Sequence, residues 1–504
     1  MRRTVTEHQA AVLALLRHGW AGKFDGGEQL PLIEGLGRVA AEDVVAPMDL
    51  PPFANSQMDG FAVSSVDFDA GAAGGPGRRT ILRAAATIPA GAVPEALRSG
   101  EAAPIMTGAM LPDGADAVVP VERADPPEFP DPRDGTATVS LIGAAAGDYV
   151  RAAGSDVRAG SLVIAAGTRL TAANLGLAAA LGLTGLAVRR RPHVLLVATG
   201  DEVVLPGNGL PAGKIYDANS MLLHANLLEA GAEVLAAGLV RDDPAELLRL
   251  LDRYLAGGRI DLIVTSGGIS AGAYEVVKQA LAGEHSGEQA LAGEHRGQQA
   301  LAGEQAGQQA LAGVPSGGRE QAFAGEQAGQ QARTGGPDGS QQGNQVEFCS
   351  VAMQPGGPQA LGTVRGVPFL GFPGNPVSGV VSFEMFLRPA LVALTGIARP
   401  RVRVRARLTE ALASPAGKVQ VRRAFYTDPD PAAGPAAGAP DPAADPAAAV
   451  VGCAEQATAA GTVTAVGGPS SHLLGSLAAS NALIQIPADV TDLPAGSNVE
   501  VWLL

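Results

Sequence analysis

Hydrophobic residues change their spacing several times along this chain, and the most regular stretch begins after Pro192. The segments HVLLVAT, EVLAAGLV and DLIVTS are short apolar runs, which is typical of buried parallel strands. Between them, NSMLLHANLLEAGA and PAELLRLLDRYLAG carry apolar residues at helical spacing. This alternation predicts a parallel sheet with helices on its faces, within residues 187–396.

The sequence on either side of this α/β domain has different patterns. Residues 47–147 hold short apolar runs broken by Gly and Pro, and residues 397–504 contain alternating runs such as VRVRARL, so both predict β-rich domains. Residues 1–46 begin with an amphipathic helix. We expect them to pair with residues 148–186 as one domain, because neither segment is large enough to form a core alone. The predicted fold class is α/β multidomain: a three-layer α/β/α domain with a parallel-rich sheet, an N-terminal helical and β segment, a small β-rich domain and a C-terminal β domain.

Two segments lack a pattern that could bury a core. A decapeptide repeat starts at Gln279 with QALAGEHSGE, and its recurring glycines oppose a continuous helix. The period is shorter than the roughly 20 residues of solenoid repeats. Residues 284–345 are therefore expected to be a disordered insertion, with a multivalent binding segment as the alternative. The Ala-, Pro- and Asp-rich residues 428–449 predict a loose loop.

Composition and charge narrow the classes of partner. A chain of 504 residues exceeds the size of a single core and predicts several domains. The formal charge of −14 argues against nucleic acid as a partner, because such surfaces are normally basic. No segment reaches the roughly 18 consecutive apolar residues that span a bilayer, which predicts a protein without a membrane span. Cys349 and Cys453 lack disulfide or metal-site spacing, and reduced thiols fit a cytoplasmic protein.

One strand-to-helix loop carries the clearest indication of an anion site. After the strand DLIVTS, the loop contains Gly267, Gly268, Ser270 and Gly272 and leads into a helix. Glycines allow a ligand to approach the backbone, serines donate hydroxyl groups, and a helix N-terminus attracts negative charge. A phosphate or oxyanion site and an ordinary turn are equally good interpretations of this loop alone.

Carboxylates follow two strands of the predicted sheet. Glu202 lies in the segment ATGDE after the first strand, and Asp242 follows the strand EVLAAGLV. Ligands bind outside the carboxyl ends of parallel strands, and oxygen ligands there suit Mg²⁺, which bridges phosphates. Capping of the next helices is the alternative. Asn55 and Asp59 lie where the Pro-rich segment PPFANSQMDGFAV bends, and either ligand binding or the closing of a turn explains them. Thr107 precedes a glycine in IMTGAMLPDGADAVVPVE.

Six blocks follow one another along the chain: PPFANSQMDGFAV, IMTGAMLPDGADAVVPVE, ATGDEVVLPG with GKIYDANS, DLIVTSGGISAG, LGFPGNPVSGVVSF and SSHLLGSLAASNALIQIP. In this order they resemble the molybdopterin molybdenumtransferase family, including the E domain of gephyrin-type proteins. The resemblance implies an elongated homodimer with a four-domain protomer. It also implies a transferase that inserts molybdate into adenylylated molybdopterin, assisted by Mg²⁺, and releases AMP. A molybdopterin adenylyltransferase or a molybdoenzyme is then a candidate protein partner.

The same resemblance implies roles for individual residues. Glu202 and Asp242 are the implied Mg²⁺ ligands. The implied catalytic residues are Asp59, Thr107, Glu202, Asp242 and Glu275. The implied pterin- and molybdate-binding residues are Asp156, Gly267, Gly268, Ser270, Gly272, Pro355, Pro358, Pro373, Asn375, Ser471 and His472.

This chain also departs from the family pattern. Glu275 stands where the family has aspartate, Gln354 and Gly357 occupy places of lysines, and Ser350 lies where a further basic residue is usual. Each lost charge-assisted hydrogen bond is worth about 1–3 kcal/mol. A catalytically weakened pterin-binding or assembly protein is therefore the second hypothesis. A third, an adenylyltransferase, leaves the two β domains unexplained.

Overall fold

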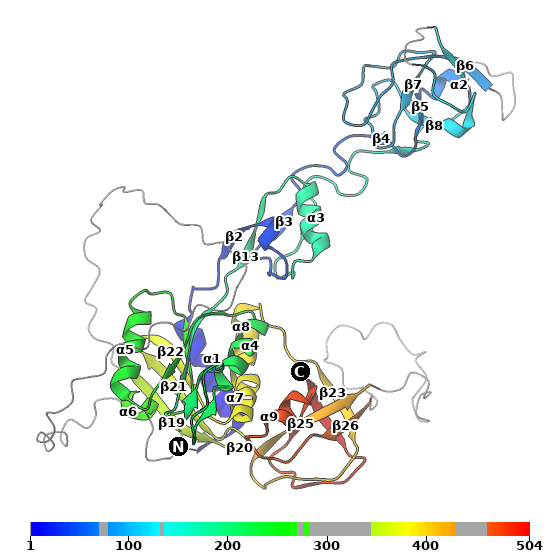
Figure 1. Ribbon diagram of the computed structural model, residues 1–504. Helices are drawn as coiled ribbons and strands as arrows, with labels where there is room; N and C mark the ends of the chain where they lie inside the picture. The colour runs from blue at the N-terminus through cyan, green and yellow to red at the C-terminus, as the bar shows by residue number, and fades with distance from the viewer. Residues whose placement is uncertain (1, 70–78, 132–135, 270–275, 282–343, 429–460) are drawn as a thin grey trace, which may run out of the picture.

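The computed structural model describes six stretches of the chain, which together form an elongated molecule (Figure 1). A small β-rich domain lies at one end, a narrow middle part follows, and the α/β and C-terminal β domains lie side by side at the other end. The predicted α/β multidomain fold class is confirmed. The described residues are 2–69, 79–131, 136–269, 276–281, 344–428 and 461–504.

The α/β domain is built on a seven-stranded sheet in the order β1-β19-β21-β22-β18-β14-β17. Strands β17, β14, β18 and β22 are parallel, β21 is antiparallel to both of its neighbours, and β1 is parallel to β19 at the edge. The apolar runs that predict parallel strands therefore form neighbouring strands. The bounds are β1 (Arg2–Arg3), β14 (His193–Thr199), β17 (Glu233–Val240), β18 (Leu262–Ser266), β19 (Gln345–Val351), β21 (Pro358–Val364) and β22 (Val367–Phe372).

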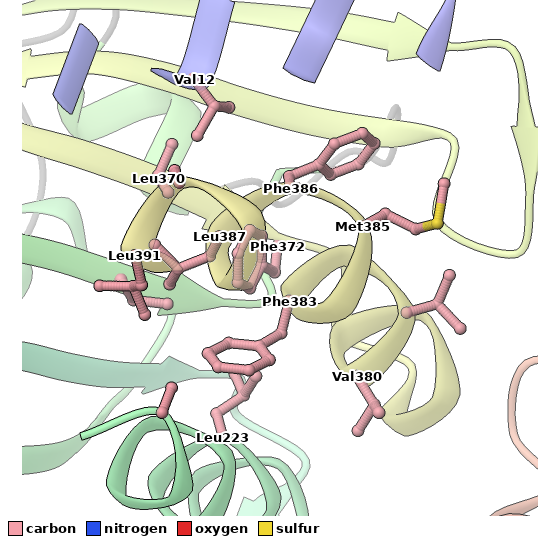
Figure 2. Packing of buried hydrophobic residues seen from close by; sticks show 14 of the residues in the cluster. Val12, Leu223, Leu370, Phe372, Val380, Phe383, Met385, Phe386, Leu387 and Leu391 are labelled. Atoms are coloured by element: carbon pink, nitrogen blue, oxygen red, sulfur yellow. The ribbon is translucent and has the colours of Figure 1, made fainter. Parts of the chain in front are cut away.

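Helices cover both faces of this sheet. Successive side chains of a strand point to opposite faces, and because these strands are apolar throughout, each face presents apolar side chains that a helix buries. Val194 and Leu196 of β14 belong to one apolar cluster, and Leu195 and Val197 belong to another. Figure 2 shows the first cluster, which also includes residues of α1, α4, α7, η3 and α8, whereas α5 and α6 pack in the second. The bounds are α1 (Val5–Gly19), α4 (Asn219–Glu229), α5 (Pro244–Leu255), α6 (Val276–Leu281), α7 (Pro376–Ser382), the π-helical η3 (Phe383–Leu387) and α8 (Arg388–Thr395).

The N-terminal helix α1 packs on the α/β domain. A capping box between Thr4 and Glu7 starts the helix, and Val12 and Leu16 are fully buried in the first cluster beside β22 and η3. This differs from the expectation that residues 1–46 pair as a whole with residues 148–186. The sheet domain offers α1 a larger apolar surface than the short 148–186 segment does.

The middle part is formed by two chain segments that are distant in sequence. Strand β2 pairs with β13, and β3 pairs with β12. Together with α3 they enclose a small core that includes Ile164, Leu170 and Leu186. The bounds are β2 (Gly27–Pro31), β3 (Val44–Val45), β12 (Leu162–Ile164), α3 (Ala172–Ala180) and β13 (Gly185–Arg189).

The β-rich domain at the far end contains a six-stranded sheet in the order β8-β5-β7-β6-β10-β9. Phe61, fully buried, packs with Leu141 in its core. A two-stranded pairing of β4 with β11 leads into the domain. The bounds are β4 (Asn55–Ser56), β5 (Gly60–Val63), α2 (Val66–Asp69), β6 (Arg79–Ala84), β7 (Glu101–Ile105), β8 (Ala117–Pro120), β9 (Ala124–Asp125), β10 (Thr138–Ile142) and β11 (Val150–Arg151).

The C-terminal β domain is joined to the α/β domain by a shared strand. Strand β20 follows β19 directly, yet it pairs with β25 of the C-terminal sheet, whose order is β20-β25-β26-β23-β29-β27. This pairing fixes the loop around β20 between the two domains. The bounds are β20 (Met353–Gln354), β23 (Arg403–Leu408), β25 (Val419–Thr427), β26 (Thr462–Ala465), α9 (Leu474–Ala478), β27 (Ala482–Ile486) and β29 (Asn498–Leu503).

The two expected low-complexity segments lie almost entirely outside the described residues. The exceptions are Asp428 and the C-terminal end of the first segment, since Gln345 is already the first residue of β19.

One described helix, Pro376–Thr395, is long and apolar enough to cross a membrane. Glu384 and Arg388 interrupt its run of apolar residues, so the sequence does not show an unbroken apolar segment there. Its most apolar 18-residue stretch is 78% buried inside the protein, so most of this apolar surface is already covered.

Candidate functional site

A crevice of about 1120 Å³ opens at the carboxyl edge of the seven-stranded sheet. Its lining comes from the segments that follow β14, β17, β18 and β22, from the loop around β20, and from the C-terminal domain. Parallel strands end together at this edge, so loops distant in sequence converge there.

Gly267 and Gly268 line the crevice after β18, in a conformation that side chains rarely adopt. Their φ angles are +94° and +67°. A Cβ at Gly267 would lie 2.8 Å from the carbonyl oxygen of Thr199, and one at Gly268 would lie 2.9 Å from Thr199 Oγ1. Only glycine fits here, and the backbone is left open to a ligand.

Three buried polar atoms of the lining lack a hydrogen-bond partner among the described residues. They are Thr199 Oγ1, Asp217 Oδ2 and Asn219 Oδ1. A buried polar atom without a partner costs about 1–3 kcal/mol. Their position in the wall of the crevice therefore favours a polar ligand or water molecules that complete their hydrogen bonds.

Two acidic loops meet at one end of the crevice. The backbone N–H of Asp242 donates to Asp201 Oδ1 at 3.2 Å, and the N–H of Asp201 lies 3.4 Å from Asp242 Oδ2. Burial raises the pKa of the Asp242 carboxyl, and the negative charges of Asp201 and Glu202 raise it further. A bound cation would relieve this repulsion.

Helix capping does not account for Asp242. The neighbouring Asp243 performs that role for α5, because its Oδ1 accepts a hydrogen bond from the N–H of Ala245 at 2.9 Å. Among the described residues, no group of three His, Cys, Asp or Glu side chains is arranged to hold a metal ion. Glu202 and Asp242 both line the crevice. One or two carboxylates are what Mg²⁺ commonly takes from a protein when phosphates and water complete its shell, so these residues fit that ion.

The C-terminal domain forms a wall of the crevice. Asn375 Nδ2 donates to Ser471 Oγ at 2.9 Å, and the N–H of Val377 donates to the carbonyl oxygen of Ser471 at 3.1 Å. His472 also lines the crevice, with its Nδ1 2.8 Å from Ser470 Oγ. Pro355, Pro358 and Pro373 complete the implied binding residues found there.

Other implied site residues lie elsewhere in the chain. Asp59 and Thr107 contact each other in the β-rich domain, where the N–H and Oγ1 of Thr107 both donate to Asp59 Oδ1 at 2.7 Å. The backbone hydrogen bond from Thr107 lowers the pKa of Asp59. Asp156 lines a separate depression with Arg158. None of these three residues lines the crevice of its own chain.

Ser270, Gly272 and Glu275 lie outside the described residues. The sequence reasoning did not identify Arg2 and Lys418, which also line the crevice. Nothing in their local sequence distinguishes them, because only the strand pairing of β1 and β25 carries them there.

Comparison with protein families gives three successive matches. Residues 3–182 match the MoeA N-terminal region (domain I and II), residues 195–323 match a probable molybdopterin binding domain, and residues 450–504 match the MoeA C-terminal region (domain IV).

Two relatives and one solved structure extend this similarity beyond the separate matches, over 79% to 100% of the chain. Molybdopterin molybdenumtransferase 2 of Mycobacterium tuberculosis is 38% identical, over 99% of this chain and 99% of its own. Molybdopterin molybdenumtransferase of Haemophilus influenzae is 28% identical, over 79% of this chain and 81% of its own. The crystal structure of a molybdopterin biosynthesis MoeA protein from Pyrococcus horikoshii is similar with a TM-score of 0.66 at 25% identity, covering 100% of this chain and 99% of that one.

Proposed function

This chain belongs to the molybdopterin molybdenumtransferase family, and from that premise we propose how its crevice works. The protein is a transferase of molybdenum cofactor biosynthesis. We propose that the crevice binds adenylylated molybdopterin and molybdate, transfers molybdenum to the pterin and releases AMP. The observation that carries this proposal is the meeting of a glycine-lined backbone, unpartnered polar atoms and a carboxylate pair in one crevice.

The phosphate groups of the substrate would lie along the glycine segment after β18. Gly267 and Gly268 allow close approach there, and Thr199 Oγ1 is a free hydroxyl donor beside them. Donors that are fixed before the reaction stabilise charge that develops as a phosphoanhydride bond breaks. These groups would therefore hold the phosphates in place while AMP leaves.

Glu202 and Asp242 would hold Mg²⁺, which supplies positive charge to the phosphate oxygens when it is bound. Burial and the neighbouring acids Asp201 and Glu202 raise the pKa of Asp242, and a bound cation would offset that effect. Both side chains belong to loops that follow the adjacent parallel strands β14 and β17, which brings them into the same crevice.

We propose that the protein acts as a homodimer. Asp59 and Thr107 form a hydrogen-bonded pair in the β-rich domain, which lies at the opposite end of the molecule from the α/β domain (Figure 1). In an elongated dimer, a second copy could bring this pair to the crevice. We also propose the cytoplasm as its compartment, in keeping with the free thiol of Cys349, and a molybdopterin adenylyltransferase or a molybdoenzyme as its protein partner.

The test is release of AMP from adenylylated molybdopterin, measured with and without molybdate and Mg²⁺. We expect release that needs molybdate, is stimulated by Mg²⁺, and falls at least about 100-fold in kcat in Glu202→Gln and Asp242→Asn. Asp243→Asn is the matched control, because this side chain caps α5. The names of the relatives favour an active transferase over a catalytically weakened pterin-binding protein. If the protein bound the pterin but released no AMP, the weakened pterin-binding protein would be the better interpretation.

A further inference from the structure

The crevice contains two basic side chains that the family pattern did not predict. We propose that Arg2 and Lys418 together bind a tetrahedral oxyanion of the substrates, and so replace the basic residues missing at Ser350, Gln354 and Gly357. This inference rests on the proposed function, because the oxyanion is either molybdate or the phosphate of the adenylylated pterin.

Arg2 reaches the crevice through the pairing of β1 with β19. Arg2 lies opposite Ser350 in this parallel register, which is the position where a basic residue is usual in the family. The next residue, Arg3, is already neutralised by an ion pair with Glu347 at 2.7 Å. Arg2 has no such ion pair among the described residues, and its guanidinium donates to the carbonyl oxygen of Gly417 at 3.3 Å. Its positive charge therefore remains available.

Lys418 approaches the same loop from the C-terminal domain. The residue after it, Val419, pairs with Met353, and Gln420 pairs with Gln354. Gln420 Nε2 also donates to Gln354 Oε1 at 3.3 Å. Lys418 thus lies beside the loop that lacks its lysines, and the hydrogen bond from Arg2 to Gly417 keeps the two cations close in space.

The distribution of charge along the crevice supports an oxyanion at this end. Glu202, Asp217 and Asp242 enter the lining from the segments after β14, before α4 and after β17, whereas Arg2 and Lys418, the arginine and lysine of the described lining, come from β1 and the residue before β25. The whole chain carries a formal charge of −14, so its long-range field repels an anion. Local cations are needed to offset that repulsion, and this pair provides them.

The experiment measures the KM of each substrate in Arg2→Gln, Lys418→Gln and the double variant. We expect the KM for the bound oxyanion to rise about tenfold per single variant, with kcat nearly unchanged. A rise confined to molybdate identifies molybdate as the ligand, and a rise confined to adenylylated pterin identifies its phosphate. Arg17→Gln and Arg407→Gln are the matched controls, since both side chains are exposed and neither lines the crevice. Arg2→Lys should retain most of the affinity.

A rescue sharpens the test. A Cβ at Gly357 would meet nothing nearer than 3.4 Å, so the structure accommodates a lysine there. Gln354→Lys with Gly357→Lys should return the KM of the double variant toward its original value. If the Arg2 and Lys418 variants had the same KM as the controls for both substrates, the proposal that Arg2 and Lys418 bind the oxyanion would be refuted. The proposed function would not be affected.

Calorimetry with molybdate alone separates the two proposals. If the unmodified protein releases no AMP, the proposed function fails. The cation pair would still be supported if the double variant lost molybdate binding that the unmodified protein and the controls show, and it would fall if all of them bound molybdate equally.

Discussion

His8 is a titratable residue buried in the core of the α/β domain, where only 1% of its surface is exposed. Its ring packs edge-on against Phe386, with the ring centroids 4.5 Å apart, and its Nδ1 lies 3.8 Å from Cys349 Sγ. Burial, with a smaller contribution from the positive charge of Arg3, lowers the pKa of His8 from 6.5 to about 4. The core therefore holds this imidazole in its neutral form.

This pKa predicts that the protein loses stability in acid. Between pH 6.5 and pH 4 the unfolded chain binds a proton at His8 and the folded chain does not, so the free energy of unfolding falls as the pH falls. The loss from this residue approaches about 3 kcal/mol near pH 4. Urea unfolding followed from pH 7 to pH 4.5 measures it. His8→Leu should flatten the dependence, whereas His18→Gln, an exposed change on the same helix, should leave it intact. An unchanged slope in His8→Leu would refute the assignment.

The predictability of individual residues depends on what brings them to the crevice. Glu202 and Asp242 could be predicted to lie near each other because they follow adjacent parallel strands, and β14 does pair with β17. Gly267 and Gly268 could also be predicted to lie at this edge of the sheet, because they directly follow the apolar run of β18. Arg2 and Lys418 could not be predicted, because pairings with residues around 350 and 353 carry them there.

At the scale of elements, a buried network of charges connects three parts of the chain. Glu384 of η3 pairs with Arg388 of α8 at 2.8 Å and with Arg401, which precedes β23, at 2.8 Å. Glu229 at the end of α4 contacts both arginines. The Glu384 side chain is 0% exposed and that of Glu229 is 52% exposed. The network therefore joins the sheet domain to the start of the C-terminal domain.

Glu384→Gln and Glu229→Gln should lower the free energy of unfolding by very different amounts. Removal of the buried carboxylate leaves the buried Arg388 without its closest partner, and we expect the free energy of unfolding to fall by about 3–5 kcal/mol. Removal of the half-exposed Glu229 should cost about 1 kcal/mol or less. Chemical denaturation of both variants gives the comparison, and equal losses would show that burial does not govern this network.

The elements themselves were predictable to different degrees. Apolar runs between helical segments predicted β14, β17 and β18 because both faces of a parallel sheet are covered. The helical character of α1 was also evident from its spacing. Its location was not, since the surface that it covers comes from β22 and η3, more than 300 residues farther along the chain.

At the scale of the whole molecule, the remote position of Asp59 and Thr107 gives the proposed dimer a direct test. If each crevice uses this pair from a second copy, Asp59→Asn and Glu202→Gln should each be inactive alone but active when mixed and reassembled. Random pairing leaves one complete crevice in half of the dimers, which corresponds to about a quarter of the original AMP release. Each variant, dissociated and reassembled with itself alone, serves as the control and should stay inactive. No recovery in a mixture shown to exchange subunits would contradict the shared crevice.

The decapeptide repeat allows a final prediction about the molecule as a whole. The elements that flank it are fixed: α6 ends at Leu281, β19 begins at Gln345, and these two elements contact each other. Because the cost of closing a loop depends only weakly on its length, deletion of residues 285–340 should raise the free energy of unfolding by about 1–2 kcal/mol at most. Thermal unfolding and AMP release of the shortened chain measure the effect.

The second low-complexity segment provides the matched deletion. Thr427 pairs with Thr462 across the start of the gap between β25 and β26, so removal of residues 432–455 also joins two fixed ends. Both deletions should leave AMP release unchanged if the segments serve only as connections. A loss of more than about 3 kcal/mol in the first deletion alone would mean that the repeat packs against the α/β domain. Retained stability with lost AMP release would instead support the repeat as a binding segment.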